Sequence, residues 1–302
     1  MLREVVKQSA PLPSNSKILI FGGGFSGQHI ANAARQLGAE VLCSRRDPTK
    51  KGADFAFDSA SKTVISDKKF NGVTHLISCV PPAQNGEDPV LEKCGHIIKN
   101  IPLKWAGYLS TTGVYGDYKG GWVTEKSEVH PRQNRSIRRL ACEQKWEALG
   151  IPLQILRLPG IYGPGRSALE AVASQKNSMV YKPGQVFSRI HIDDIAGSII
   201  HLINLFSKDI CPRIINISDS LPATNIEVLS CAANLLDIPI PDIESFESAS
   251  KKMSPMALSF WQENRKVSNH KLCNSLGYEL IHPDYQSGLK DCLRDSKLIN
   301  TL

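Results

Sequence analysis

A glycine-rich turn near the N-terminus has the spacing needed to bind the phosphates of a dinucleotide. Gly22, Gly24 and Gly27 form a G-x-G-x-x-G pattern, with Phe25 and Ser26 between the second and third glycines. The first glycine allows a tight turn, the second lets the backbone approach a pyrophosphate, and the third lets the next helix pack closely. The N–H groups at the start of that helix would bind the phosphates. These five residues are therefore predicted to contact a dinucleotide.

Two arginines indicate which dinucleotide binds. Ser44, Arg45 and Arg46 end the second predicted strand, and no carboxylate follows until Asp47. An NAD site usually has an acidic residue here for the ribose 2′-hydroxyl, whereas an NADP site usually has arginine for the 2′-phosphate. Paired guanidiniums suit a phosphate through charge-assisted hydrogen bonds. We therefore expect Ser44, Arg45 and Arg46 to contact the cofactor, with NADP(H) favoured over NAD(H); solvated loop arginines are the alternative.

A cluster of hydroxyl side chains ends a later predicted strand. Ser110, Thr111 and Thr112 are consecutive, and Tyr115 and Tyr118 follow closely. Loops at the carboxyl end of a parallel strand face the ligand crevice of an α/β sheet. The three hydroxyl residues are predicted to polarise a substrate oxygen, and either tyrosine is a candidate proton donor. For Tyr115, packing within the turn is the alternative.

Arginines elsewhere in the chain are candidate contacts for an anion. Arg135 and Arg139 belong to a group of four arginines at the start of a helix predicted over 136–149. Residues three and four apart share a helix face, so they could clamp an anionic ligand; a solvated basic surface is the alternative. No stacking aromatics are interleaved with them, which argues against nucleic acid. Arg189 is a further candidate substrate contact.

The elements that must position these residues alternate between strand and helix. Apolar runs rich in β-formers predict strands over 17–21, 39–43, 74–80, 105–110 and 153–158. Helical spacing predicts helices over 28–37 and 136–149. Strands alternating with helices indicate a parallel sheet covered on both faces. The predicted fold is therefore a Rossmann-type, doubly wound α/β sheet.

The remaining chain is predicted to form a smaller, mostly helical part. Helices are expected over 169–175, 194–206 and 226–236, with short strands over 186–192 and 213–217. Residues 1–16 are expected to form an arm, 17–165 the dinucleotide-binding domain, and 166–302 the substrate-binding part. This last part would be interleaved with the final elements of the sheet at about 186–217.

Composition and charge narrow the class of protein. The 302 residues carry 36 Lys+Arg against 29 Asp+Glu, a net charge of +7 that suits an anionic small molecule and is too small to indicate nucleic acid. The eight cysteines form no C-x-x-C pair, and no histidine spacing indicates a metal site. No apolar run approaches the ~20 residues that span a bilayer. A cytoplasmic protein without a membrane partner or metal is expected.

Four segments together resemble the extended short-chain dehydrogenase/reductase superfamily, in its NAD-dependent epimerase/dehydratase branch. They are the glycine turn and residues 109–116, 157–165 and 190–196, and the resemblance covers about residues 17–290. It implies a doubly wound sheet with a small substrate-binding part near the C-terminus. It also implies that His191 and Asp194 pin their segment to the core.

The chain departs from that family where the family has its catalytic tyrosine and lysine. Aligning the helix after residue 139 puts Arg135 at the tyrosine position and Arg139 at the lysine position. A guanidinium cannot act as a base at neutral pH, although Arg139 could still hold the ribose or a phosphate. Asp117 and Glu125 are further candidate acids or bases. The departure resembles atypical subgroups that keep the cofactor site and lose the Tyr–Lys pair.

Two functions remain open on the sequence. The first is an NAD(P)-dependent oxidoreductase or epimerase/dehydratase-like enzyme acting on a small, anionic hydroxyl or carbonyl substrate such as a nucleotide-sugar, with hydride exchange at the nicotinamide. The second is a catalytically silent NADP(H)-binding redox sensor or regulatory protein. Related proteins often pair through helices that flank the sheet, so a homodimer is a possible assembly.

Overall fold

The computed structural model describes residues 2–61, 65–174 and 179–295. Its centre is a seven-stranded parallel sheet with the order β11-β7-β5-β4-β1-β2-β3. The strands are β1 Lys17–Phe21, β2 Glu40–Arg45, β3 Phe55–Ala56, β4 His75–Ser78, β5 Trp105–Thr111, β7 Leu153–Leu158 and β11 Ile214–Asn216. The predicted Rossmann-type sheet is confirmed, and it takes in β11 from the C-terminal part of the chain.

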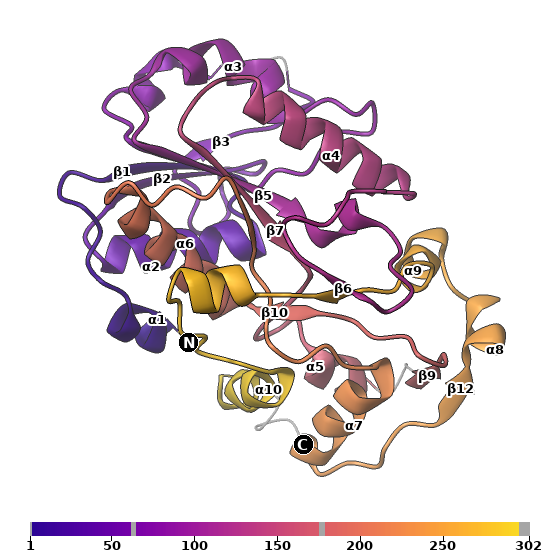
Figure 1. The fold of residues 1–302 in the computed structure, drawn as a ribbon. Coiled ribbons are helices and arrows are strands. Elements are labelled where there is room, and N and C mark those ends of the chain that lie inside the picture. The colour runs from indigo at the N-terminus through magenta and orange to yellow at the C-terminus, as the bar shows by residue number, and fades with distance from the viewer. Residues whose placement is uncertain (1, 62–64, 175–178, 296–302) are drawn as a thin grey trace.

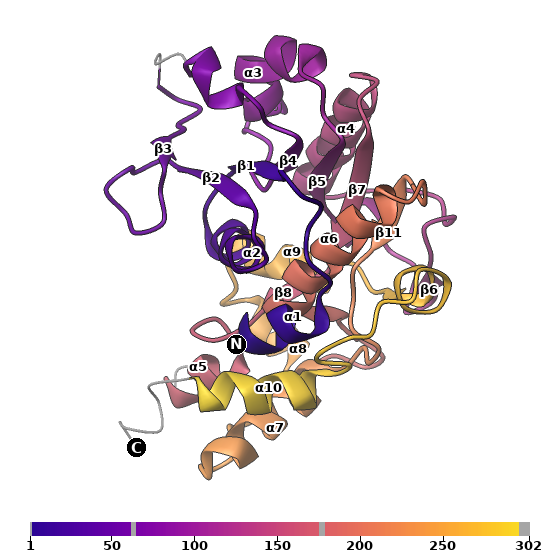
Figure 2. The same ribbon diagram turned by 90° about the vertical axis from the view of Figure 1, so that its left-hand side faces the viewer.

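Helices cover both faces of this sheet (Figure 1, Figure 2). On one face lie α1 Leu2–Gln8, α2 Phe25–Gln36 and α6 Ile192–Phe206, and on the other α3 Pro89–Asn100 and α4 Asn134–Glu147. The core of the first face contains Ile30 and Ile199, and that of the second contains Ile98 and Trp146. The strands are apolar because both of their faces are buried.

The order of the strands creates a crevice at one edge of the sheet. From β1 the chain runs outward to β2 and β3 and then returns to β4 on the other side of β1. Ligands of such sheets bind at this reversal, beyond the carboxyl ends of the strands. The glycine turn follows β1 and Thr112 follows β5, so both lie at this edge with only β4 between their strands.

A smaller part of the chain packs below the crevice. It contains α5 Ala168–Ala173, α7 Asn225–Leu236 and α10 Tyr285–Arg294, which share a core of their own that includes Leu169, Leu229 and Leu289. Further helices here are α8 Phe246–Ser250 and α9 Pro255–Trp261. The predicted helix over 169–175 runs to Ala173 in the structure, and its last predicted residue lies outside the described part.

Short parallel strand pairs tie this part to the sheet. They are β8 Gly160–Tyr162 with β10 Arg189–His191, β9 Met179–Tyr181 with β12 Ile243–Ser245, and β6 Trp122–Val123 with β13 Lys266–Val267. The strand predicted over 186–192 is therefore shorter and belongs to a separate two-stranded sheet. Three single turns of helix complete the fold: η1 Asp67–Phe70, η2 Thr112–Tyr115 and η3 Lys271–Ser275.

The N-terminal segment differs from the predicted arm. Residues Leu2–Gln8 form helix α1, which packs on α6 and α2, and Val5 is fully buried. Leu2 and Val5 are three residues apart, so they share a face that the sheet-covering helices bury. Among the described residues, no helix has the length and apolar character needed to cross a membrane.

Candidate active site

The glycine turn has the geometry that a dinucleotide requires. Gly22 has φ +92°, a conformation that favours glycine, and a Cβ on Gly27 would lie 2.2 Å from the Gly22 carbonyl oxygen. A Cβ on Gly24, in contrast, would meet nothing within 4 Å, so the backbone there is open on the side of the crevice. Helix α2 begins directly after it, at Phe25 and Ser26. These residues fit a pyrophosphate at the start of α2.

Ser44 has a different role from the predicted one. It is fully buried, and its hydroxyl accepts a hydrogen bond from the Gly22 N–H at 3.0 Å, while its carbonyl accepts from Gly23. The Ser44 side chain thus holds the glycine turn against β2, and a contact between Ser44 and the cofactor stays a prediction. Gly23 is also constrained: a Cβ there would lie 2.7 Å from the Cys43 sulfur, a requirement that the motif alone does not include.

Arg45 and Arg46 lie at the end of β2, beside the glycine turn. Arg45 is half-buried and donates to the Lys51 carbonyl at 2.8 Å, and Arg46 is exposed. A guanidinium has five N–H donors, so Arg45 keeps donors for a ligand. The two side chains stay predicted contacts for a 2′-phosphate.

A cavity of about 380 Å³ opens at the end of β5. Its walls come from the β5 end, the start of α4, the segment before β10 and the segment between α9 and β13. The lining residues used below are Thr111, Thr112, Arg135, Arg189, Asn225, Phe260, Trp261, Glu263 and Arg265. Three cationic, two aromatic and several hydroxyl or amide side chains thus surround a space large enough for a small ligand.

Two predicted sets of residues meet in this cavity. Thr111 accepts the Gly113 N–H at 3.1 Å, which leaves its own O–H proton available, and Thr112 lies beside it on the wall. Arg135 faces the same space, with its guanidinium 3.7 Å from the centroid of the exposed Phe260 ring. Burial lowers the pKa of Arg135, an effect that nearby Glu263 opposes. A partly desolvated cation over an aromatic face is suited to hold an anion.

Arg189 lies between this cavity and a second one of about 190 Å³. Its guanidinium donates to the carbonyls of Phe187 at 2.8 Å and Ala223 at 3.1 Å, and burial lowers its pKa. Asn225 lines both cavities as well. Asp219 is a titratable group close to Arg189, and it is 1% exposed. Burial raises its pKa to about 8, although the positive charge of Arg189 acts to lower it.

The raised pKa of Asp219 makes stability depend on pH. In the folded protein the pKa of Asp219 lies above its ordinary value of 3.8. The contribution of this carboxyl to stability is therefore most favourable below pH 3.8, and it is lost as the pH rises through about 8. Asp219→Asn removes the effect. We expect the difference in unfolding free energy, variant minus wild type, to be about 2–4 kcal/mol larger at pH 9 than at pH 5 when urea unfolding is measured at both pH values. A difference that is constant with pH would contradict this assignment.

Comparison with known proteins identifies the family. The sequence model of the NAD dependent epimerase/dehydratase family matches residues 18–218. The chain belongs to this family. The matched span contains the glycine turn, both arginines after β2, the threonines of the cavity and Arg189. No curated protein matches the chain by sequence.

Solved structures agree with this assignment. A conserved protein of unknown function from Silicibacter pomeroyi is 33% identical, with a TM-score of 0.83 over 93% of this chain and 99% of that one. The human epimerase family protein SDR39U1, solved with NADPH, is 17% identical, with a TM-score of 0.70 over 92% and 99%. UDP-glucuronic acid 4-epimerase from Bacillus cereus, solved with UDP-glucuronic acid and NAD, is 17% identical, with a TM-score of 0.75 over 95% and 100%. The last two show the shared fold alone.

Ser110 belongs to a buried polar network that this epimerase/dehydratase family member builds behind the cavity. Its hydroxyl donates to Glu143 on α4, whose carboxylate also accepts from Arg157 on β7 at 3.1 Å and 2.7 Å. All three side chains are buried. The one donor of Ser110 is engaged and the residue does not line the cavity, and its role in polarising a substrate oxygen stays a prediction.

The two tyrosines also lie outside the cavity lining. Tyr115 is fully buried, donates to Asn216 Oδ1 at 2.7 Å, and has the Arg157 guanidinium 4.9 Å from its ring centroid. Burial raises its pKa further from neutrality. Tyr118 donates to the Glu128 carbonyl at 2.9 Å. Both hydroxyl protons are thus engaged within the protein, and the role of either phenol as the proton donor stays a prediction.

Arg139 lies at the end of β5 but not in the cavity lining. It donates to the Leu109 carbonyl at 2.8 Å, and its guanidinium is 5.6 Å from the Tyr108 ring centroid. A guanidinium has five N–H donors, so Arg139 keeps donors for a ligand at this edge of the sheet. Arg139 stays a predicted cofactor contact.

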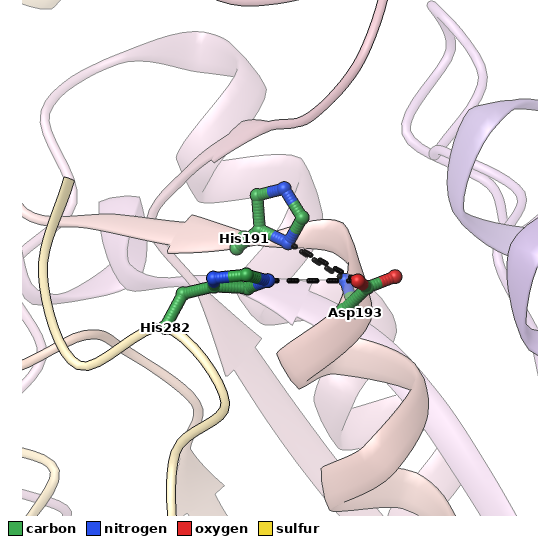
Figure 3. Close-up of side chains that lie close together, drawn as sticks. All are labelled: His191, Asp193 and His282. Carbon is green, nitrogen blue, oxygen red and sulfur yellow. Dashed lines mark hydrogen bonds and ion pairs between the residues drawn. The ribbon is translucent and has the colours of Figure 1, made fainter. Parts of the chain in front are cut away.

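A histidine cluster anchors the start of α6 (Figure 3). His191 Nδ1 lies 3.8 Å and His282 Nε2 3.5 Å from Asp193 Oδ2, and His29 Nε2 lies 2.5 Å from Asp193 Oδ1. Burial would raise the pKa of Asp193, but the surrounding imidazoles lower it to about 2. The next residue, Asp194, accepts the backbone N–H groups of residues 281 and 282. These contacts support the expected pinning role of His191 and Asp194.

The ligand atoms of His191, Asp193 and His282 all lie within 4.8 Å of one another, close enough to surround a metal ion. The carboxylate already pairs with His29, and His191 Nε2 lies 3.5 Å from the Cys292 sulfur. Through these contacts the cluster connects helices α2, α6 and α10, which explains why its residues lie together. The cluster is separate from the lining of the large cavity.

Glu263 is a cavity residue that sequence reasoning missed. It lies between α9 and β13, and its carboxylate is 5% exposed. Glu263 is far from residues 111 and 135 in the sequence, and no sequence motif connects it with them. Glu263 is brought to the cavity wall by the pairing of β13 with β6 and by hydrogen bonds from Gln185 to Glu263 and from Asn264 to Asp117.

Proposed function

We propose that this family member is an NADP(H)-dependent oxidoreductase or epimerase/dehydratase-like enzyme for a small, anionic hydroxyl or carbonyl substrate such as a nucleotide-sugar. The observation that carries the proposal is the cavity in which Thr111, Thr112 and Arg135 meet, at the same sheet edge as the glycine turn. The glycine turn, Arg45 and Arg46 would hold the dinucleotide. When bound, the nicotinamide would exchange hydride with a substrate carbon.

The protein's own side chains would bind and polarise the substrate. Thr111 and Thr112 would donate to the reacting oxygen, since Thr111 has a free O–H proton on the cavity wall. Arg135 and Arg189 would hold the anionic group at opposite parts of the wall. Structures of the same fold have been solved with NADPH and with UDP-glucuronic acid and NAD, which agrees with a nicotinamide dinucleotide and a nucleotide-sugar as ligands.

A substrate screen with hydroxyl-deleted variants tests this proposal. NADP⁺ is mixed with UDP-glucuronic acid, UDP-glucose or 6-phosphogluconate, and NADPH formation is followed at about 340 nm. Thr111→Val/Thr112→Val is expected to lower kcat on the order of 100-fold, because removing one preorganised donor costs about that much. Thr124→Val, in an exposed turn, is the matched control. Unchanged turnover in the double variant would contradict the proposed role.

A redox sensor is the second candidate. It is favoured by the predicted replacement of the family's catalytic pair by Arg135 and Arg139. The hydroxyls of Ser110 and Tyr115, which are engaged within the protein, favour it as well. A sensor would bind NADPH without oxidising it with any carbonyl compound tested. Hydride exchange with a substrate therefore separates the two functions.

A further inference from the structure

Glu263, in the wall of the large cavity, has one buried carboxylate oxygen without a hydrogen-bond partner among the described residues. Arg265 donates to Oε2 at 2.8 Å, whereas Oε1 is buried and has no hydrogen-bond partner among the described residues. Leaving a buried acceptor without a hydrogen-bond donor costs folding free energy. Because Glu263 lines the cavity, a ligand that brings an O–H or N–H donor to Oε1 would remove that cost.

The surrounding chain holds this carboxylate in place. The Glu263 carbonyl accepts from the Gln185 side chain at 3.0 Å, and the N–H of Asn264 donates to Asp117 at 2.9 Å. Arg265 also donates to the Gly116 carbonyl at 2.8 Å, so the partner of Oε2 is itself fixed. The unpaired oxygen is therefore a preorganised feature of the wall.

No other described residue of the lining can take a proton at neutral pH. The lining has Arg135, Arg189 and Arg265, which remain charged, together with serine, threonine, asparagine and apolar side chains. It contains no histidine, lysine, cysteine, tyrosine or aspartate. The candidates outside it are engaged: Glu125 accepts from Asn216, and Asp117 accepts from Asn264.

We infer that Glu263 is the catalytic base that takes the place of the missing tyrosine, and that the substrate carries a hydroxyl group close to its anionic group. This inference rests on the proposed function. In the oxidising direction, the substrate O–H bond breaks and its proton moves to Glu263 Oε1. The C–H bond breaks with its electron pair, the hydride goes to NADP⁺, and a C=O bond forms. In the reducing direction, protonated Glu263 returns the proton to the oxygen.

The neighbouring charges fit this role. Arg135 lies close enough to Glu263 for their charges to interact, and the sequence predicts that it replaces the family's tyrosine. A substrate anion paired with Arg135 would thus bring its adjacent hydroxyl toward Glu263, while Thr111 donates to the same oxygen. The cavity would select hydroxy-acids and sugar acids or phosphates over neutral alcohols.

The test compares Glu263→Gln with Glu263→Asp and with Glu128→Gln, an exposed glutamate outside the cavity as the matched control. The probes are UDP-glucuronic acid, UDP-glucose and 6-phosphogluconate with NADP⁺, and NADPH binding is measured separately by fluorescence. Glu263→Gln keeps an oxygen for Arg265 and is expected to lower kcat/KM by about 10²–10⁴-fold, with NADPH affinity unchanged. Glu263→Asp should restore part of the activity.

The pH profile distinguishes a base from a structural residue. Wild-type kcat/KM should fall at acidic pH, and Glu263→Gln should lose this limb. The arginines that face Glu263 keep their charge throughout, and Asp219 beside Arg189 titrates in both proteins. If Glu263→Gln keeps wild-type kcat/KM and pH profile, the inference is overturned. If wild type binds NADPH but neither oxidises a probe nor converts it to an epimer or a dehydration product, the proposed function fails, and the inference with it.

Discussion

Glu143→Ala is expected to lower the free energy of unfolding by about 3–5 kcal/mol, because it leaves a buried guanidinium without its counter-charge. Glu143 accepts two hydrogen bonds from Arg157 and one from Ser110, and both charged side chains are less than 5% exposed. Arg157 also lies over the Tyr115 ring. Loss of the carboxylate would therefore disturb β5, β7 and the turn after β5 together. Urea unfolding followed by circular dichroism measures the effect.

Two further variants show whether charge or packing is responsible. Glu143→Leu/Arg157→Met replaces both partners with apolar side chains, and it should recover much of the lost stability. Glu128→Ala, on the surface, should change stability by less than about 0.5 kcal/mol. A destabilisation of Glu143→Ala as small as that of the surface variant would contradict the buried network.

Arg45→Ala/Arg46→Ala is expected to weaken NADPH binding on the order of 100-fold, because each hydrogen bond to a charged phosphate contributes about 1.5–3 kcal/mol. Both side chains end β2 beside the glycine turn, and Arg45 is already ordered by the Lys51 carbonyl. NADH lacks the 2′-phosphate, so its affinity should change little. Fluorescence titration of the double variant with each nucleotide measures the difference.

The matched control for these arginines is Arg213→Ala. Arg213 is exposed and directly precedes β11, so it lies at the opposite edge of the parallel sheet. It should leave the affinity for NADPH unchanged. Equal losses of NADPH affinity in the control and the double variant would indicate a general charge effect and not a phosphate site.

The parts of this fold that the sequence predicts are those determined by local pattern. Strand β1, the glycine turn and helix α2 follow one another directly in the chain. Each can be predicted from the residues next to it, and their order indicates a dinucleotide-binding unit. The same holds for β7, predicted over 153–158 and found as Leu153–Leu158. The prolines and serines of residues 1–16 predict an irregular arm. The structure has a helix there, because Leu2 and Val5 lie on one helix face that packs against the fold.

The parts that could not be predicted depend on partners distant in the chain. Ser110 and Thr111 are neighbours of similar chemistry, yet Ser110 donates a hydrogen bond to Glu143 and Thr111 lines the cavity. Tyr115 donates a hydrogen bond to Asn216, about a hundred residues away in sequence. Which hydroxyl reaches a ligand is therefore decided by tertiary packing. Glu263 reaches the cavity for the same reason, through the pairing of β13 with β6.

The most direct test of the central claim is titration of the purified wild-type protein with NADPH and with NADH, following nicotinamide fluorescence. We expect saturable NADPH binding that is at least about tenfold tighter than NADH binding, since the arginines after β2 would contact the 2′-phosphate. Binding of neither nucleotide would contradict the proposed dinucleotide site, because the glycine turn would then have no dinucleotide to hold. Equal affinity for both would contradict the assignment of Arg45 and Arg46.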